Sequence, residues 1–437
     1  MTAKNDKKII KAWAMFDWSN SAYNLVITST IFPAYYTAIT TTKIDGVITD
    51  DKVNFFGLTF VNTALSNYAL AIAYLIIAII TPFLTATADF RGNKRLFMKI
   101  FTWIGAIACC GLYFFKASTL ELGVILFAIA AIGYCGGMVF NNSYLPDIAT
   151  PDQQDKISAK GFAYGYIGSV ILQIICFVFV LMPDLFGITD ASFPARLSFL
   201  LVGIWWIGFS YIPFTVLPKS SPSYNKKIQM KVANGYQELR KVWGQLKEMP
   251  VLKTFLLAYF FYAMGVQTIM LVAANFGEKI LNLGTSKLIA TILIIQLVAI
   301  FGAFLMSRLS KVYGNIKVLM FVVLIWITTC IAAYFIQNEY QFYGLAAVVG
   351  LIMGGIQSLS RSTFSKYLPE NIAETASFFS FYDVTEKLAI VAGLFSFGFI
   401  EELTGNMRNS ALSLGVFFII GFVVLFLVLK KERGVLV

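Results

Sequence analysis

The sequence predicts an all-α membrane protein with twelve transmembrane helices arranged as two pseudo-symmetric bundles of six. Three observations predict this class. Of the 437 residues, 58% are hydrophobic and only 13% are charged, whereas about 25% of residues are charged in a typical soluble domain. Twelve segments are apolar and long enough to cross a bilayer, which takes about 20 residues. Short motifs of the first half also recur at equivalent positions in the second half.

The expected spans follow one another through short loops, except after the sixth. They are residues 11–38, 54–85, 96–115, 120–143, 160–182, 196–217, 251–275, 286–306, 317–337, 341–361, 376–400 and 409–430. We therefore expect an N-terminal six-helix bundle at 1–217, a basic cytoplasmic linker at 218–250 and a C-terminal six-helix bundle at 251–437.

The distribution of positive charge predicts the orientation. With the N-terminus inside, 26 of the 34 Lys and Arg residues fall on the inner side, 7 fall in outer loops and Lys387 lies within a span. Because inner loops are enriched in Lys and Arg, both termini are expected in the cytoplasm, with the cell (inner) membrane as the expected location. The net charge of +11 then reflects topology, and no nucleic-acid partner is expected.

The linker at 218–250 has apolar residues at helical spacing with basic residues between them. These apolar residues are Ile228, Val232, Tyr236, Leu239, Trp243 and Leu246. The pattern predicts an amphipathic helix that lies on the inner membrane surface and ends at Pro250. The alternatives are a solvated linker and a binding site for a regulatory partner.

Two pairs of short motifs relate the halves. The Gly-Asn pair at 92–93, after span two, matches the pair at 314–315, after span eight. The motif YLPD at 144–147, after span four, matches YLPE at 367–370, after span ten. A duplication of this kind is typical of transporters built from two repeats, whose binding site lies near the midplane between them.

Polar side chains within the expected spans predict a central cavity. Charged residues, Asn and Gln occur well inside eight of the spans, whereas spans three, six, nine and twelve have none away from their ends. Because polar groups in a bilayer normally face a cavity or the bundle interior, these eight helices are expected to surround a polar space. The candidate cavity residues are Asp17, Asn20, Tyr23, Asn24, Asn141, Tyr164, Gln267, Gln296, Gln357, Tyr382, Asp383, Glu386 and Lys387. For single amides such as Gln296, the alternative is a hydrogen bond to a neighbouring helix.

The charged residues of spans one and eleven have the strongest claim to a functional role. Lys387 lies about 16 Å into its span at 1.5 Å per residue, where an ammonium needs a carboxylate partner or an anionic ligand. Asp383 lies four residues earlier, so a purely structural pair with Lys387 is the alternative. Asp17 has three open roles: bonding its own helix, facing a cytoplasmic vestibule, or pairing with Arg361 or Lys387. Because the chain has no histidine, the candidates for carrying a coupled proton are Asp17, Asp383 and Glu386.

The turn after span two resembles the signature G-x-x-x-D-R-x-G-R-R of the major facilitator superfamily. The corresponding residues are Thr85, Asp89, Arg91, Gly92, Lys94 and Arg95. The acid, the second glycine and the closing basic pair match, while the first glycine is a threonine and the arginine after the acid is displaced. In the second half, Lys311 stands where the acid would be.

Six further blocks are similar to the branch once called the unknown major facilitators, which includes the fungal autophagy-related vacuolar amino-acid effluxers. The blocks, which span essentially the whole chain, are WAMFDWSNSAY, NNSYLPDIA, GFAYGYIGS, GIWWIGFSYIPF, GGIQSLSRSTFSKYLP and FFSFYDVTEKLA. The resemblance implies the major facilitator fold and alternating access, but no single cargo, since one fold serves many.

The resemblance also implies a cytoplasmic latch in which Asp89 meets the positive N-terminal end of span eleven. Closing this latch would favour the outward-facing state, and the alternative is a solvated loop acid. The expected latch residues are Asp89, Arg91, Gly92, Lys94, Arg95 and Arg361.

The expected function is secondary active transport of a small polar solute, an amino acid or short peptide first, with a proton as the candidate coupling ion. The alternatives are a transporter of another organic anion or metabolite and a transport-inactive sensor or scaffold that acts through the basic linker. An enzyme is not expected, because the chain lacks histidine, G-x-S-x-G, zinc-ligand spacing and a phosphate loop. No cofactor or metal is expected, the five cysteines read as buried reduced thiols, and we expect a monomer in the lipid bilayer.

Overall fold

The computed structural model describes residues 4–44, 47–219, 232–369 and 372–434. In the first half the helices are α1 (Lys7–Ala22), a π-helical segment (Tyr23–Ile31), α2 (Phe32–Thr40), α3 (Asn62–Arg91), α4 (Lys94–Gly111), α5 (Leu120–Asn142), α6 (Leu145–Ile148), α7 (Pro151–Leu181) and α8 (Phe193–Val216). Helix α9 (Val232–Lys247) follows, and then α10 (Pro250–Leu281), α11 (Thr285–Tyr313), α12 (Asn315–Phe335), α13 (Glu339–Tyr367), α14 (Thr375–Thr404) and α15 (Met407–Glu432). Short 3-10 turns lie at Leu112–Phe114, Ala117–Thr119 and Pro183–Phe186.

Local sequence explains where several helices begin and end. The carboxylate of Asp6 accepts the N–H groups of Lys8 and Ile9 and caps α1. Proline occupies the first turn of α7, α8 and α10, where its missing N–H costs nothing. Gly92 ends α3 with a φ of 66°, a left-handed conformation that glycine adopts without strain.

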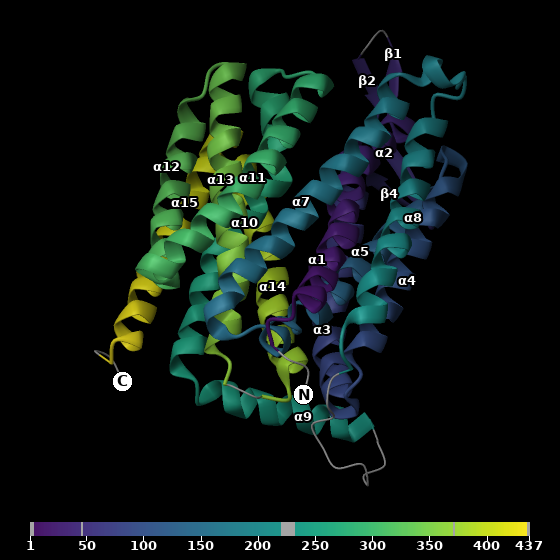
Figure 1. The fold of residues 1–437 in the computed structure, drawn as a ribbon. Helices are drawn as coiled ribbons and strands as arrows, with labels where there is room; N and C mark the ends of the chain where they lie inside the picture. The colour runs from purple at the N-terminus through teal and green to yellow at the C-terminus, as the bar shows by residue number, and fades with distance from the viewer. Residues whose placement is uncertain (1–3, 45–46, 220–231, 370–371, 435–437) are drawn as a thin grey trace.

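The helices pack as two groups with a shared interface. In Figure 1, α10 to α13 and α15 lie on the left and α1 to α5 with α8 on the right, with α7 and α14 between them. One buried hydrophobic cluster consists almost entirely of residues before 218, and the other almost entirely of residues after 241. The groups meet where α7 packs on α11 and α13, and where α14 packs on α3 and α5.

Ten helices among the described residues are long and apolar enough to cross a membrane: α3, α4, α5, α7, α8, α10, α11, α12, α13 and α15. The other two expected spans are less regular or less apolar. The first is divided by the π-helical segment into pieces of 16, 9 and 9 residues. The second is α14, which is less apolar because it carries Asp383, Glu386 and Lys387.

The expectation that span two begins at residue 54 is wrong. Residues 54–61 belong to a hairpin of β3 (Lys52–Phe55) and β4 (Leu58–Val61), which follows a first hairpin of β1 (Thr42–Ile44) and β2 (Val47–Asp50). The turn of the second hairpin places Phe56 and Gly57 at φ 48° and 82°, the positive values that a two-residue hairpin loop requires. The apolar run there is therefore strand and turn, and the helix starts only at Asn62.

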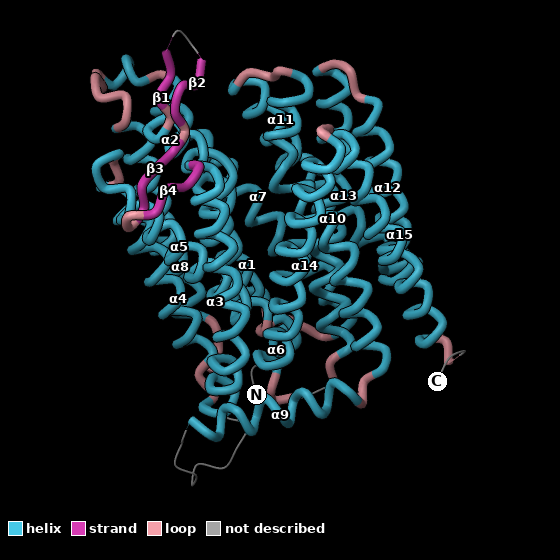
Figure 2. Tube along the Cα trace, turned by 180° about the vertical axis from the view of Figure 1, so that it is seen from behind, coloured by secondary structure: helices cyan, strands magenta, loops and turns pink. Residues whose placement is uncertain are grey.

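The two ends of the molecule differ. The start of α1, the end of α15 and helix α9 lie at one end, which we call the terminal end, and the hairpins lie at the opposite end (Figures 1 and 2). Helix α9 buries Val242 and Leu246 and packs against α3, α10 and α14. It ends at Lys247, and Pro250 begins the next helix rather than ending this one. The expected amphipathic residue Ile228 lies outside the described residues.

Candidate functional site

A polar pocket lies between the two groups of helices. About 880 Å³ of space is free of protein atoms there, including the opening to solvent. Its lining residues come from the π-helical segment, α3, α5, α7, α10, α13 and α14, and none comes from α4, α8, α12 or α15. Seven of the residues expected in the cavity line it, namely Asn24, Gln267, Gln357, Tyr382, Asp383, Glu386 and Lys387.

The charged centre of this pocket is on α14. Asp383, Glu386 and Lys387 are three and four residues apart, a spacing that puts them on one face of the helix. The Lys387 ammonium lies 3.2 Å from Asp383 Oδ1 and 3.1 Å from Glu386 Oε2. Gln267 on α10 donates to Glu386 Oε1 at 2.6 Å. Asp383 Oδ2 is buried and has no hydrogen-bond partner among the described residues.

Tyrosine rings form much of the pocket wall. Tyr259 and Tyr382 stack with their ring centroids 4.3 Å apart. The Lys387 ammonium lies 5.6 Å from the ring centroid of Tyr74. The pocket therefore combines the three charged groups of α14 with aromatic faces, which attract cations.

The end of the pocket nearest the chain termini is closed by Arg361 of α13, which is 1% exposed. Its Nη1 donates to Asp17 at 3.1 Å and to Asn142 at 3.0 Å. Its Nε and Nη2 donate to the hydroxyl and the carbonyl of Ser158 at 3.0 and 2.8 Å. These contacts join α13 to α1, α5 and α7 in the other half, so the pair of Asp17 and Arg361 bridges the two groups.

The bridge is closely packed. The Arg361 guanidinium lies against the rings of Trp13 and Phe162, 4.7 and 4.2 Å from their centroids. Asn141 donates to the second oxygen of Asp17 at 3.2 Å. A Cβ atom at Gly161 would collide with Asp17 Oδ2 and would lie 2.7 Å from Arg361 Nη2, so the close approach of α1, α7 and α13 requires glycine there.

Asp89, at the end of α3, meets the N-terminus of α14. Its carboxylate accepts the backbone N–H and the hydroxyl of Ser377, both at 2.7 Å, and the N–H of Ala376 at 3.3 Å. Lys94 contacts Thr375 and donates to Asp147 at 2.8 Å. A helix N-terminus carries free N–H groups and a partial positive charge, and a carboxylate satisfies both.

The other expected latch residues are placed differently. Arg95 donates to the carbonyl of Leu217 at 2.8 Å, within its own half. Arg91 is exposed, and Gly92 shapes the turn. Arg361 lies with Asp17 rather than with Asp89. Among these residues only Asp89 and Lys94 reach α14 through the contacts described.

A second acid at the terminal end also crosses between the halves, and the sequence reasoning missed it. Asp155 of α7 accepts from Lys366 at 2.5 Å and Ser310 at 3.0 Å through Oδ2, and from Asn315 at 2.8 Å through Oδ1. It thereby contacts α13, α11 and the start of α12. Asn315 belongs to the repeated Gly-Asn motif, so the sequence marked this turn. It did not indicate that the turn contacts an acid 160 residues away.

Six of the expected cavity residues lie outside the pocket: Asp17, Asn20, Tyr23, Asn141, Tyr164 and Gln296. Asp17 and Asn141 belong to the bridge described above. Asn20 is fully buried, and Tyr23 stacks on Trp206 inside the first group of helices.

The pocket also contains residues that were not expected in the cavity: Tyr74, Tyr134, Asn142, Tyr259, Tyr262, Ser360 and Arg361. Three of the tyrosines and Asn142 lie on helices that carry expected cavity residues. A tyrosine inside an apolar span does not by itself indicate a cavity, because its ring can also be buried in the core of a bundle.

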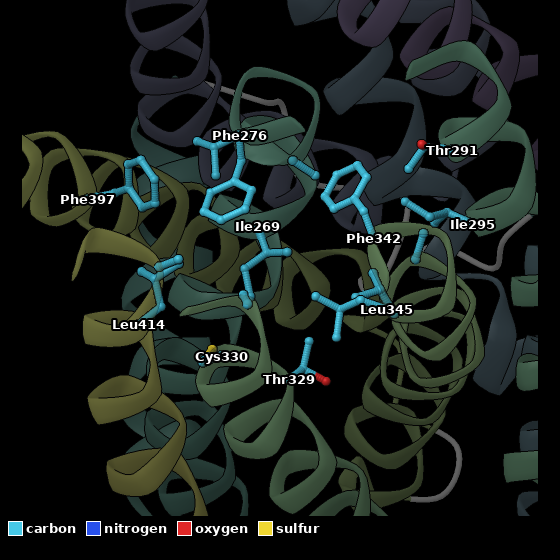
Figure 3. Close-up of a pocket in the computed structure, with 16 residues that line it drawn as sticks. Ile269, Phe276, Thr291, Ile295, Thr329, Cys330, Phe342, Leu345, Phe397 and Leu414 are labelled. Carbon is cyan, nitrogen blue, oxygen red and sulfur yellow. The ribbon is translucent and has the colours of Figure 1, made fainter. Parts of the chain in front are cut away.

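An apolar cavity of about 580 Å³ lies inside the second group of helices. Figure 3 shows Phe276, Phe342 and Ile269 turned toward this space. Thr291, Thr329 and Cys330 are the only lining residues with polar or sulfur atoms in the side chain. The lining residues of this cavity include no charged group with which to orient a polar ligand.

Within the described residues, no group of three His, Cys, Asp or Glu side chains is placed to hold a metal ion.

The family is decided by a sequence model described as "Vacuole effluxer Atg22 like", which matches residues 5–435. The chain belongs to the Atg22-like family of the major facilitator superfamily. The uncharacterized MFS-type transporter YxiO of Bacillus subtilis is 31% identical over 415 residues, covering 95% of this chain and 93% of YxiO. Autophagy-related protein 22 of Yarrowia lipolytica is 24% identical, covering 87% of this chain and 78% of that protein.

Solved structures agree on the fold of this Atg22-like chain. The outward conformation of the MFS transporter FucP superimposes with a TM-score of 0.69 at 13% identity, covering 96% of this chain and 98% of FucP. Human MFSD10, described as an organic anion transporter, gives 0.67 at 13% identity, with 95% and 98% covered. The protein is thus an MFS-type transporter and an integral multi-pass membrane protein.

Proposed function

We propose that the protein is a secondary active transporter that moves a small polar solute by alternating access, with an amino acid or short peptide as the favoured cargo. The observation that carries this proposal is the polar pocket between the two groups of helices, closed at one end by ion pairs that bridge them. In this proposal the chain has twelve spans, and both termini are cytoplasmic in the cell membrane. Residues 1–217 rock against residues 251–437 around the pocket, and residues 218–250 link them.

The charged contacts at the terminal end support a state in which that end is closed. Asp89 on the N-terminus of α14, Asp155 on three helices of the second half, and the pair of Asp17 with Arg361 all join the two groups there. We infer that these contacts break together when the pocket opens to the cytoplasm. Asp89 with Lys94 forms the latch in this scheme, and Arg361 acts through Asp17.

The proposed coupled ion is a proton, and Asp383 is the best of the three candidate carriers. Asp17 is already engaged by Arg361 and Asn141 through both carboxylate oxygens. Glu386 is engaged by Gln267 and Lys387. Asp383 keeps one oxygen without a partner among the described residues, so that oxygen is free to take up a proton.

An amino-acid or peptide cargo is supported by the carboxylates of Asp383 and Glu386 at the pocket, which suit the ammonium group that these solutes carry. The description of the family as vacuole effluxer-like supports a transport role, and the choice of cargo is our proposal.

The experiment is solute flux into proteoliposomes that contain the purified protein, with labelled amino acids and dipeptides, with and without a pH gradient. We expect one class of solute to move and its rate to respond to the gradient, and empty liposomes are the control. If no solute of a broad panel moves while the linker alone recruits a partner protein, the transporter proposal fails and a sensor or scaffold takes its place.

A further inference from the structure

We propose that the pocket selects a protonated amine and does not require a carboxylate on the cargo, and that the amine takes the place of a proton on Asp383. This inference rests on the proposed function only in assuming that the cargo occupies this pocket. It narrows the cargo from polar solutes in general to molecules that carry an ammonium group.

The first step is that Arg361 has little left to offer an anion. A guanidinium has five N–H groups, and four of them are already donated to Asp17, Asn142 and Ser158. The rings of Trp13 and Phe162 also lie against it. A cargo carboxylate would have to break the bridge between the two groups to reach this arginine.

The second step is that Lys387 is also engaged. Its ammonium lies within 3.2 Å of Asp383 and 3.1 Å of Glu386 and faces the ring of Tyr74. With Asp17 balanced by Arg361, the charges that remain are two carboxylates and one ammonium. The pocket therefore carries one surplus negative charge when both carboxylates are ionised.

The third step is that the pocket has acceptors to spare for a cation. Asp383 is 5% exposed and lines the pocket, and its Oδ2 has no hydrogen-bond partner in the part of the chain that the structure describes. The side chain of Glu386 is 23% exposed. Tyr259 and Tyr382, stacked beside these carboxylates, supply aromatic faces that attract an ammonium.

The surplus charge must be neutralised when the pocket is empty, because an uncompensated buried charge is costly. A proton on Asp383 does this, and it leaves for solvent when an ammonium arrives. The groups that face Asp383 are Glu386, Lys387 and Tyr382 on α14, Tyr74 on α3, and Tyr134 and Cys135 on α5. From α10 and α13 the pocket adds Tyr259, Tyr262 and Arg361. Tyrosine and cysteine ordinarily ionise well above neutral pH, so the two carboxyls are the groups that exchange a proton.

The experiment compares compounds that share an alkyl chain and differ in the head group. The purified protein is mixed with butylamine, hexylamine and octylamine, and with the carboxylates and alcohols of the same lengths. Thermal unfolding and calorimetric titration are measured at pH 6 and pH 8, where the amines stay protonated. We expect amines to bind and to raise the unfolding temperature, carboxylates not to bind, and amine affinity to rise up to ~10-fold per pH unit.

Two variants locate the site. Asp383→Asn should weaken amine binding and remove its pH dependence, whereas Glu401→Gln, on the same helix but outside the pocket, should change neither. Where Asp383→Asn does not fold, proton release on adding hexylamine to the unmodified protein in weak buffer replaces it, and about one proton per bound amine is expected.

The outcomes separate this inference from the proposed function. Binding of carboxylates or alcohols as tight as that of amines, or amine binding without proton release, overturns the inference even if solutes are transported. Amine binding with proton release in a protein that moves no solute leaves the inference standing and overturns the proposed function. No binding by any amine of the series overturns the inference.

Discussion

Two clusters of buried charge lie along the same pocket and differ in how completely they are paired. Arg361 and Asp17 carry one charge of each sign, and their hydrogen bonds tie together helices of both halves. Asp383, Glu386 and Lys387 sit on one helix, with two acids for one base. A fully paired cluster holds structure in place, whereas an unevenly paired one keeps the capacity to bind an ion or a ligand. On this reasoning the cluster of Arg361 and Asp17 closes the molecule, and the cluster on α14 recognises the cargo.

Breaking the paired cluster should have the largest effect. Arg361→Ala leaves the Asp17 carboxylate buried without a counter-charge, which costs about 3–5 kcal/mol. We expect a lower unfolding temperature and flux at background. The double variant Asp17→Asn with Arg361→Gln should recover more than half of the lost stability, because no charge is left unpaired. Equal stability of the single and double variants would contradict the pairing.

Asp17→Asn alone should lower flux or alter its pH dependence, and unchanged flux with unchanged pH dependence would remove Asp17 from the mechanism.

Gly161→Ala tests the same cluster by shape alone. The added methyl group collides with Asp17 and approaches Arg361, and overpacking of this kind costs about 1–3 kcal/mol. We expect thermal unfolding to shift down and flux to fall. Gly208→Ala on α8 is the control, since a Cβ there has nothing within 4 Å. If both variants behave alike, the bridge does not depend on close approach at Gly161.

Lys387→Ala should separate binding from stability. Loss of the ammonium leaves two carboxylates close together, and one of them can take up a proton. The stability cost should then be smaller than that of Arg361→Ala, where the buried charge that remains has no such relief. We expect transport to be abolished while expression and folding remain near normal. A variant that fails to fold would show that Lys387 is structural and that the two clusters are alike.

The smallest effect is expected at the latch. Asp89→Asn removes the charge at the N-terminus of α14 and replaces one of two accepting oxygens by an NH2 group, which costs up to about 2 kcal/mol at a buried site. Amide hydrogen exchange at residues 375–380 should become faster, with a modest fall in the unfolding temperature. Asp155→Asn is the comparison: it should speed exchange at the start of α12 and leave α14 unchanged. Faster exchange throughout both halves would mean that the two contacts are one cooperative unit.

The sequence already contained much of the candidate site, because its spacing is local. Asp383, Glu386 and Lys387 share a helix face by their numbering alone, and Gln267, Gln357 and Asn24 stood out as polar residues in apolar helices. Asp17 was left with three roles, since nothing in one helix shows which cation it meets. Its partner lies 344 residues away, and only the packing of α1, α7 and α13 through Gly161 brings the two together.

By itself, then, the sequence determined an all-α membrane protein, the helices that carry polar groups and the family, because hydropathy, spacing and motifs are properties of short segments. The tertiary structure decided which charges are balanced and which are in surplus, because that depends on contacts between helices far apart in the chain. It also showed that residues 54–61 form a hairpin with positive φ angles at Phe56 and Gly57, although their apolar composition had suggested the start of a helix. Arg361 and Lys387 are both buried cations, and they differ in the charge around them: Arg361 pairs with one acid, whereas Lys387 lies between two.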